Sequence, residues 1–186
     1  MEAEVLLWIQ NNIRFSGFNP VMEAITHLGD FGLFWILMMV VLLLCQKTRK
    51  VGVAVGIALL GSFVFNNLLL KNLVARTRPY EVIDGLQLLV SRAVDLSFPS
   101  GHAASSFAAA VVMAKLLPKR YGIAALILAG LIAFSRLYVG IHYPTDVLFG
   151  AVSGCLIGWL VAKFYGEKAV SGPTSIFLAG KLKGKK

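Results

Sequence analysis

The chain has 186 residues, of which 58% are hydrophobic and only 15% are charged, and it carries a formal net charge of +9. This length gives room for one domain, and the hydrophobic content excludes an ordinary soluble protein, so we expect an integral membrane protein. The two cysteines lie inside apolar runs. They exclude a disulfide framework and are expected to be small buried hydrophobic residues.

The N-terminal segment, residues 1–28, predicts two short helices that lie in the membrane interface. Residues 5–13 form an amphipathic pattern that is too short to cross a bilayer, because a crossing needs about 20 residues. A second short helix is expected over residues 19–28. The apolar run over residues 31–45 then predicts the first membrane span, and basic residues close it: Lys47, Arg49 and Lys50.

Four further apolar segments predict the remaining spans, at residues 51–70, 99–118, 121–138 and 144–164. A polar loop over residues 72–98 connects the second span to the third and is expected outside the membrane. The last span carries glycines at four-residue spacing, which favour close packing against a neighbouring helix: Gly150, Gly154 and Gly158.

These elements predict a single all-α domain, an integral membrane helical bundle of about five transmembrane helices plus the short N-terminal interfacial helices. We expect the domain to cover residues 1–166 and a flexible, basic tail to occupy residues 167–186. Membrane lipids would surround the bundle, and nothing in the sequence predicts binding of nucleic acid. The sequence leaves the oligomeric state open.

The distribution of charge predicts the orientation of the bundle. With five spans, 12 of the 18 Lys and Arg residues fall on one side, and eight of the nine carboxylates fall on the other. The positive-inside rule makes the basic side cytoplasmic. We therefore expect a multi-pass plasma-membrane protein with a cytoplasmic C-terminus. Three polar islands then meet on the extracytoplasmic face, at residues 71–79, 99–102 and 135–146.

Cationic side chains and a helix start predict a binding site for a phosphate group on that face. Lys71, Arg78 and Arg136 bring positive charge beside Ser100 and Gly101, which begin the third span. Backbone N–H groups at a helix N-terminus bind anions together with Lys and Arg side chains. Ser100 is expected to cap the helix, and Gly101 lets the backbone approach a ligand closely. Taken alone, this stretch is more simply an ordinary helix start.

Two of the three histidines make this binding site a candidate reaction centre. His102 and His142 both lie at helix beginnings on the same side, and Asp146 lies in the first turn of the fifth span, within reach of His142. A carboxylate that holds one imidazole nitrogen leaves the other free to attack, and His102 is then available as an acid. The alternative is a His–Asp pair that only stabilises a helix start. His27 lacks such neighbours and is expected to be an interfacial residue.

Three motifs together resemble the signature of the phosphatidic acid phosphatase type 2 superfamily, and the resemblance covers residues 51–164. The motifs are Lys71, six residues, Arg78-Pro79; Pro99-Ser100-Gly101-His102; and Ser135-Arg136, five residues, His142, three residues, Asp146. All three match in order and spacing, and linked motifs are far more specific than any one of them.

The resemblance implies a membrane phosphatase that forms a phosphohistidine. It implies that His142 is the nucleophile, that Asp146 orients it, and that His102 protonates the leaving group. The residues that would hold the phosphoryl oxygens are Lys71, Arg78, Ser100, Gly101 and Arg136. The resemblance implies no metal and no cofactor, and no carboxylate pair or His cluster has metal-ligand spacing. Arg76 has no place in the signature, and we expect it to contact substrate or headgroups or to be solvated.

The expected substrate is an anionic lipid phosphate or diphosphate that reaches the site from the membrane. The short N-terminal helices resemble those of undecaprenyl diphosphate phosphatases, so this carrier lipid is the first expectation. Phosphatidylglycerophosphate and phosphatidic acid are left open, because the motifs bind the phosphate and not the lipid tail. The alternative of another class is a non-catalytic protein that binds or transports phosphorylated lipid through the same cations.

Overall fold

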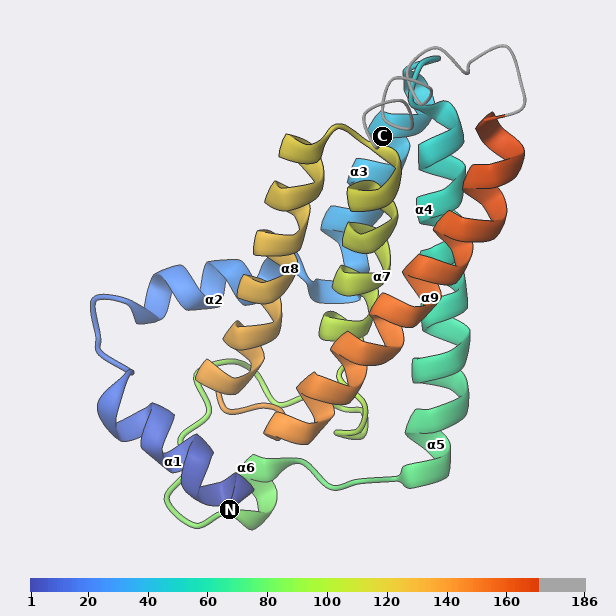
Figure 1. Cartoon of the computed structure of the whole chain (residues 1–186). Coiled ribbons are helices and arrows are strands. Elements are labelled where there is room, and N and C mark those ends of the chain that lie inside the picture. The colour runs from blue at the N-terminus through green and yellow to red at the C-terminus, as the bar shows by residue number, and fades with distance from the viewer. Residues whose placement is uncertain (171–186) are drawn as a thin grey trace.

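The computed structural model describes residues 1–170, and this part of the chain is all-helical (Figure 1). The helices in chain order are α1 (Glu2–Asn12), α2 (Asn19–Leu28), η1 (Asp30–Gly32), α3 (Leu33–Leu44), α4 (Arg49–Ser62), η2 (Phe63–Leu70), α5 (Lys71–Val74), α6 (Pro79–Val82), α7 (Gly101–Leu116), α8 (Lys119–Tyr138) and α9 (Pro144–Val170). The helices α3, α4, α7, α8 and α9 run along one direction as a bundle (Figure 1). The expected fold class, an all-α membrane bundle, is confirmed.

Three helical segments are long and apolar enough to cross a membrane alone, at residues 49–82, 119–138 and 144–165. The pair formed by α2 and residues 30–44 passes the same test only together, across a 47° bend. α7 has 16 residues, fewer than the about 20 that a full crossing needs, because a polar start and Pro118 limit it. By length and composition the described residues therefore hold three spans, or four with the bent pair, where the sequence predicted about five.

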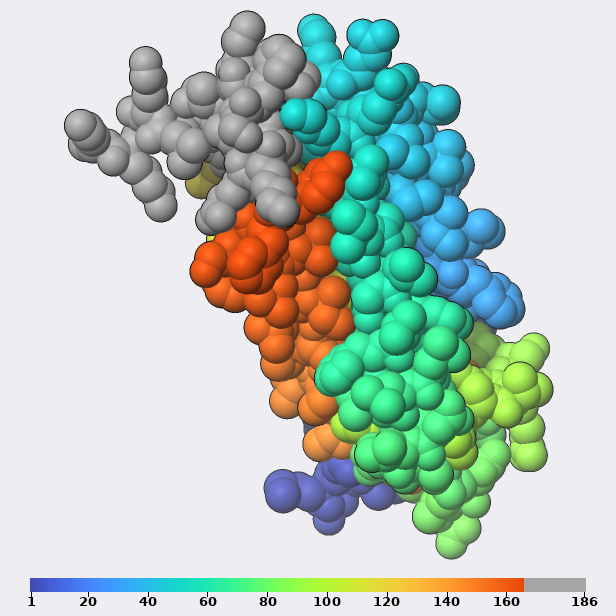
Figure 2. All heavy atoms as spheres, turned by 90° about the vertical axis from the view of Figure 1, so that its right-hand side faces the viewer, coloured from blue at the N-terminus to red at the C-terminus, as the bar shows by residue number. Residues whose placement is uncertain are grey.

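The outer surface of the bundle is apolar, as a lipid-facing surface must be. Figure 2 shows the face on which α4 lies in front, between α9 and α3. Large side chains exposed on α4 and α9 include Val53, Ile57, Leu60, Leu148, Val152 and Leu156. A soluble monomer rarely exposes so much contiguous apolar surface, which agrees with a membrane protein.

α7 lies at the centre of the bundle and packs directly against the backbone of α9. A Cβ atom added at Gly154 would lie 2.3 Å from the carbonyl oxygen of Ala104, and one at Gly150 would lie 2.5 Å from that of Ser100. The predicted close packing of the glycine face is thus confirmed. At the same interface the Ser100 N–H donates to the carbonyl oxygen of Asp146 at 3.1 Å, so the first turns of both helices are held together.

α4 continues without a break through the π-helical segment η2 into α5, where Lys71 lies. Asn66 in η2 is buried; its Nδ2 donates to the carbonyl oxygen of Ser62 at 3.1 Å, and its Oδ1 accepts from Ser153 Oγ at 2.8 Å. These bonds satisfy a polar side chain inside an apolar segment. π-helical turns are frequent at functional sites, and this one ends directly before the buried amine of Lys71.

The N-terminal helices cover the bundle on one side. α2 lies across the direction of the bundle and packs on α8, while α1 contacts the end of α8 and the start of α9 (Figure 1). Leu6, Ile9 and Met22 are buried by these contacts. Both predicted short helices therefore exist, and they are packed against the same end of the bundle that holds the polar islands.

The expectation of two buried cysteines is wrong. Cys45 is exposed, because α3 ends at Leu44 and the cysteine begins the following turn, and Cys155 is only partly buried. At the other end of the chain, α9 continues to Val170, four residues beyond the expected domain boundary at residue 166. The rest of the predicted tail, residues 171–186, lies outside the described residues.

Candidate active site

The three polar islands lie at the end of the bundle where α5 ends and where α7 and α9 begin (Figure 1). Hydrogen bonds join the islands to one another. Arg78 Nη1 donates to the carbonyl oxygen of Ile141 at 2.9 Å, and the Ser100 N–H donates to that of Asp146 at 3.1 Å. Segments that are far apart in the sequence therefore form one polar cluster.

His142 and Asp146 lie side by side at the start of α9, and both are buried. The Nδ1 atom of His142 is 3.5 Å from Asp146 Oδ2. The same oxygen accepts from Ser97 Oγ at 2.5 Å and from the Tyr143 N–H at 3.0 Å, while Oδ1 accepts from Arg76 Nη1 at 2.7 Å. Both oxygens of the carboxylate are therefore held in place beside the imidazole ring of His142.

The contact between Arg78 and His142 determines the protonation of the imidazole. Arg78 Nη1 lies 3.1 Å from His142 Nε2. The same Nη1 atom is 3.5 Å from Nδ1, so Nε2 is the nearer acceptor for a guanidinium, which only donates. The proton of a neutral ring is then on Nδ1, which faces Asp146. Burial lowers the pKa of His142 well below its usual value of 6.5, and nearby charges lower this pKa further: Arg78, Arg136, His102 and Lys71. His142 is therefore neutral, with a lone pair on Nε2.

Lys71 and Arg78 bind a carboxylate of the chain itself. Lys71 Nζ donates to one oxygen of Asp95, and Arg78 Nη2 donates to the other at 2.5 Å. The two cations are buried, whereas the side chain of Asp95 is 49% exposed. Burial raises the pKa of Asp95, but the hydrogen bonds and charges of Lys71 and Arg78 outweigh this and lower the pKa to about 2. This pair of cations thus forms an anion-binding cluster.

Arg136 is buried in the last turn of α8, and only some of its N–H donors have a hydrogen-bond partner. Its Nη1 donates to Thr26 Oγ1 on α2 at 2.5 Å. Its Nε is buried and has no hydrogen-bond partner among the residues that the structure describes. An unpaired buried donor is costly, so Arg136 has one strong donor available for a phosphoryl oxygen.

The start of α7 brings Ser100, Gly101 and His102 to the same end of the bundle. Ser100 is the N-cap residue, and its Oγ accepts from the Ala103 N–H at 3.5 Å. A Cβ atom at Gly101 would lie 3.0 Å from Asn67 Nδ2, so the backbone packs closely there. His102 Nε2 lies 3.0 Å from Asp30 Oδ1, and its charge acts on His142. The structure thus gathers all eight residues singled out in the sequence at one end of the bundle.

Arg76 has a position that the sequence did not indicate. Besides Asp146, its guanidinium binds Thr145 Oγ1 at 2.8 Å and Glu2 Oε2 at 2.5 Å, and it lies 3.7 Å from the ring centroid of Tyr143. The expectation of a solvated or ligand-contacting side chain is replaced by a structural link between α1 and the start of α9.

Other contacting residues were also missed by the sequence motifs: Thr26, His27, Asp30, Asp95 and Ser97. Each contacts a motif residue or its partner from a distant segment, so no spacing rule connects them. The one available signal is chemical, because a carboxylate such as Asp30 or Asp95 between apolar stretches requires a partner.

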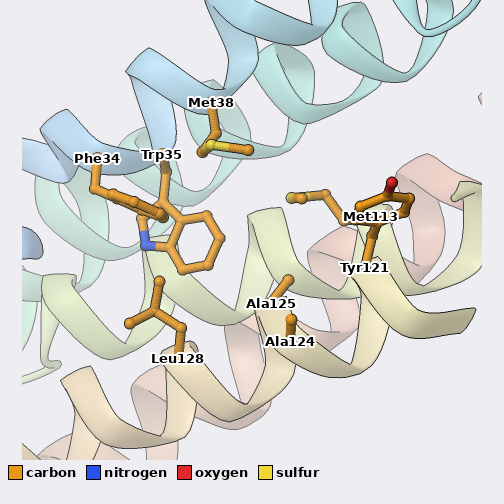
Figure 3. Close-up of a pocket in the computed structure, with 8 residues that line it drawn as sticks. All are labelled: Phe34, Trp35, Met38, Met113, Tyr121, Ala124, Ala125 and Leu128. Atoms are coloured by element: carbon orange, nitrogen blue, oxygen red, sulfur yellow. The ribbon is translucent and has the colours of Figure 1, made fainter.

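A separate cavity of about 170 Å³ lies between α3, α7 and α8 (Figure 3). It is lined by Phe34, Trp35, Met38, Met113, Tyr121, Ala124, Ala125 and Leu128. This lining carries no charged side chain, so the cavity lacks the cations of the polar cluster. Within residues 1–170, no three His, Cys, Asp or Glu side chains are arranged to hold a metal ion.

Comparison with known proteins identifies the family. Residues 48–169 match the sequence profile of the PAP2 superfamily. An undecaprenyl-diphosphatase of Sulfolobus acidocaldarius is 35% identical over 126 residues, which are 68% of this chain but only 61% of that relative. A decaprenylphosphoryl-5-phosphoribose phosphatase of Mycobacterium tuberculosis is 31% identical over 163 residues, 86% of this chain and 88% of the relative.

Solved structures have the same fold. The crystal structure of a transmembrane PAP2-type phosphatidylglycerolphosphate phosphatase from Bacillus subtilis matches with a TM-score of 0.72 and 31% identity, over 89% of this chain and 85% of that one. Aquifex aeolicus LpxE matches with a TM-score of 0.72 over 87% of this chain and 94% of that one; at 24% identity this likeness concerns the fold alone. Motifs, fold and relatives agree, and the chain belongs to the PAP2 superfamily of membrane phosphatases.

Proposed function

We propose that this protein hydrolyses a lipid phosphate or diphosphate through a phosphohistidine intermediate. The observation that carries the proposal is the arrangement around His142: its Nδ1 faces Asp146 at 3.5 Å, and its Nε2 accepts from Arg78 at 3.1 Å. Such an imidazole is neutral and oriented, and its lone pair faces cations that bind anions. Membership of the PAP2 superfamily supports the same chemistry.

In the first step, the Nε2 lone pair of His142 attacks phosphorus. An N–P bond forms, the P–O bond to the leaving group breaks, and His102 donates a proton to the departing oxygen. Asp146 keeps the Nδ1 proton of His142 in place and stabilises the positive charge on the phosphorylated ring.

In the second step, water attacks the phosphohistidine, the N–P bond breaks, and inorganic phosphate leaves. His102, now neutral, takes the proton from the water and so returns to its starting form. Charge on the phosphoryl oxygens is stabilised in both steps by the same donors, namely Lys71, Arg78, Ser100, Gly101 and Arg136.

The proposed substrate is undecaprenyl diphosphate. Support comes from the names of relatives, which include the Sulfolobus undecaprenyl-diphosphatase and an undecaprenyl-diphosphatase of Bacillus subtilis, 31% identical over 78% of this chain. Phosphatidylglycerophosphate is the second candidate, because the B. subtilis structure that covers 89% of this chain is a phosphatidylglycerolphosphate phosphatase. Phosphatidic acid has the same reacting group and belongs in the same comparison.

We further propose that the site faces the extracytoplasmic side. The turns between α3 and α4 and between α7 and α8 lie at the end of the bundle opposite to the site (Figure 1). These turns are basic, with Lys47, Arg49, Lys50, Lys119 and Arg120. The positive-inside rule states that turns rich in Lys and Arg lie on the cytoplasmic side. The opposite end, which holds the site, would then be extracytoplasmic.

Phosphate release by the purified protein in detergent tests the proposal. Undecaprenyl diphosphate, phosphatidylglycerophosphate and phosphatidic acid are compared at equal surface concentration, and we expect the highest kcat/KM for the first. His142→Ala should lower kcat by about 10,000-fold or more, as removal of a covalent nucleophile does. With substrate labelled in the transferred phosphate, an alkaline quench should trap labelled protein, and His142→Ala should trap none.

Two outcomes would contradict the proposal. Phosphate release that His142→Ala leaves undiminished would eliminate this mechanism. Lipid binding by the parent protein without release from any of the three lipids would favour the non-catalytic binding protein. Because the proposed chemistry uses no metal, EDTA in the assay should leave the rate unchanged.

A further inference from the structure

The bend between α2 and α3, residues 29–32, contacts the proposed acid, His102. We call this bend the elbow. Asp30 lies at this elbow, and its Oδ1 is 3.0 Å from His102 Nε2. Its Oδ2 is 2.7 Å from Nδ1 of His27. The side chains of His102, Asp30 and His27 are 17%, 41% and 61% exposed, so this row of three groups leads from the site to the surface.

The backbone of the elbow is shaped around the imidazole ring. A Cβ atom at Gly29 would lie 2.4 Å from His102 Cδ2 and 2.9 Å from Ile132 Cγ2, so only glycine lets the chain pass this close. Directly after Asp30, Phe31 and Gly32 have φ angles of 53° and 68°. A non-glycine residue in this region is strained, and such strain persists where the surrounding structure requires it. The turn holds Asp30 against His102.

His102 needs a negative neighbour to act as an acid. It is largely buried, and the charged groups that act on it are Asp30 from the elbow, Arg136 from α8 and Lys71 from α5. His142, in the connection between α8 and α9, also lies within electrostatic reach. Burial and two cations oppose protonation of an imidazole, and Asp30 is the group among these that favours it.

We propose that Asp30 is the positioning residue of the general acid: it accepts a hydrogen bond from Nε2–H of His102, favours the protonated ring against burial and the two cations, and leaves Nδ1–H as the donor to the leaving oxygen. This inference rests on the proposed function, in which His102 protonates the leaving group. In this proposal the two histidines use opposite ring nitrogens. His142 has Asp146 on Nδ1 and attacks through Nε2, whereas His102 has Asp30 on Nε2 and donates through Nδ1.

His27 fixes the second oxygen of Asp30, which stops the half-exposed carboxylate from rotating away. Both residues precede the region that matches the family profile, which begins at residue 48. The elbow thus belongs to the N-terminal part of the chain, whereas the motif residues lie in the family region.

Kinetics of Asp30→Asn test the proposal, because the amide keeps the shape but removes the charge. We expect kcat to fall about 10- to 100-fold, part of the about 100- to 10,000-fold that an acid contributes. KM should change little, because Asp30 does not contact the phosphate. The alkaline limb of the kcat profile, where His102 loses its proton, should move to lower pH by about 1–3 units. Asp30→Glu keeps the charge and should restore most of the rate. Glu23→Gln on α2 is the matched control and should have the wild-type kcat and pH profile.

A titration that needs no turnover provides the second measurement. The chain contains three histidines, so ¹⁵N-histidine-labelled protein gives three imidazole signals, assigned with His27→Gln and His102→Gln. In Asp30→Asn the midpoint of the His102 signal should move to lower pH, while the His142 signal should stay in place. If the midpoint of the His102 signal is the same in the wild type and in Asp30→Asn, then Asp30 does not set the protonation of His102 and the proposal is overturned.

The outcomes separate this proposal from the proposed function. A wild-type protein without lipid phosphatase activity would contradict the function. An active wild type, together with an Asp30→Asn variant of equal kcat and equal pH profile, would contradict the role of Asp30 alone.

Discussion

At the scale of single residues, the cations of the candidate site are paired with carboxylates of the chain itself. Lys71 and Arg78 bind Asp95, and Arg76 binds Asp146. A buried cation without a partner is strongly destabilising, so each carboxylate stabilises its partner in the folded protein. Asp146 is itself buried, but Asp95 is half exposed on a loop. On the proposed function, a phosphate group displaces Asp95 while the buried cations stay in place.

Asp95→Asn is expected to tighten the binding of phosphate-like inhibitors. The amide keeps the shape of the side chain but removes the negative charge that competes for Lys71 and Arg78. The inhibition constant of orthovanadate should fall about 5- to 30-fold, the factor that corresponds to 1–2 kcal/mol. Because the pKa of Asp95 is about 2, the wild-type carboxylate stays ionised and this ratio should be constant from about pH 5 to pH 8. Asp84→Asn in the same loop is the control, and weaker inhibition in Asp95→Asn would contradict the competition.

Arg78→Gln is expected to move the acid limb of the pH–rate profile to higher pH. His142 must be neutral to attack, and burial, followed by the charge of Arg78, lowers its pKa well below 6.5. Wild-type kcat should therefore keep its plateau as the pH falls below 6.5. Without the charge of Arg78 the pKa rises, so protonation inactivates the variant at higher pH, by about 1 unit or more. Arg92 is an exposed loop arginine, and Arg92→Gln should retain the wild-type acid limb. If Arg78→Gln also leaves the acid limb unchanged, the ionisation of His142 does not control the rate at low pH.

At the scale of elements, the N-terminal helices supply partners to residues of the motifs. Glu2 of α1 binds Arg76, which holds Asp146; Thr26 of α2 binds Arg136. With Asp30 of η1 on His102, the first 32 residues contact one proposed catalytic residue directly and a partner of Asp146. Their short lengths and amphipathic pattern predict helices outside the membrane core, but not these contacts, because each one joins residues far apart in the sequence.

Gly154→Ala is expected to destabilise the interface between α7 and α9. The new Cβ would lie 2.3 Å from the carbonyl oxygen of Ala104, and a backbone atom cannot rotate away, so the helices must separate. Overpacking of this kind costs about 1–3 kcal/mol, and the thermal unfolding temperature in detergent should fall. Gly130→Ala on α8 is the matched control, because its Cβ meets no atom within 4 Å. Equal unfolding temperatures for the two variants would contradict direct helix contact at Gly154.

At the scale of the whole molecule, charge is separated along the bundle. The turns between α3 and α4 and between α7 and α8 lie at one end, and the candidate site with its loop and α1 lies at the other (Figure 1). The basic residues of the turns include Lys47, Arg49, Lys119 and Arg120. The arrangement of helices therefore converts a pattern along the sequence into two chemically different ends, which supports the proposed orientation in the membrane.

Labelling of Cys45 tests this orientation. Cys45 is exposed at the turn after α3, and a hydrogen bond from the Lys47 backbone lowers the pKa of its thiol, which favours the reactive thiolate. In a Cys155→Ala background, a membrane-impermeant maleimide should label Cys45 only after intact cells are permeabilised. In a Cys45→Ala, Cys155→Ala background, Ser91→Cys in the loop should be labelled without permeabilisation. The reverse pattern would place the candidate site in the cytoplasm.

Much of the molecule could be predicted because its determinants are local. Apolar runs, Pro and Gly positions and the basic turns predict helices and their order, and the all-α bundle and the packing of Gly154 agree with this. By length and composition alone the described residues hold three or four spans, because α7 has only 16 residues. Cys45 was placed inside a helix that ends one residue earlier. These differences arise at helix ends, where tertiary contacts and turns decide the last residues.

The sequence alone determined the membrane character, the helical class and the identity of the motif residues, because composition and spacing along the chain are sufficient for these. Only the tertiary structure decided which groups partner the motif residues: Asp95 between Lys71 and Arg78, Arg76 on Asp146, and Asp30 on His102. The physical reason is that hydrogen bonds and ion pairs act over about 3 Å in space, while 72 positions separate Asp30 from His102 in the sequence.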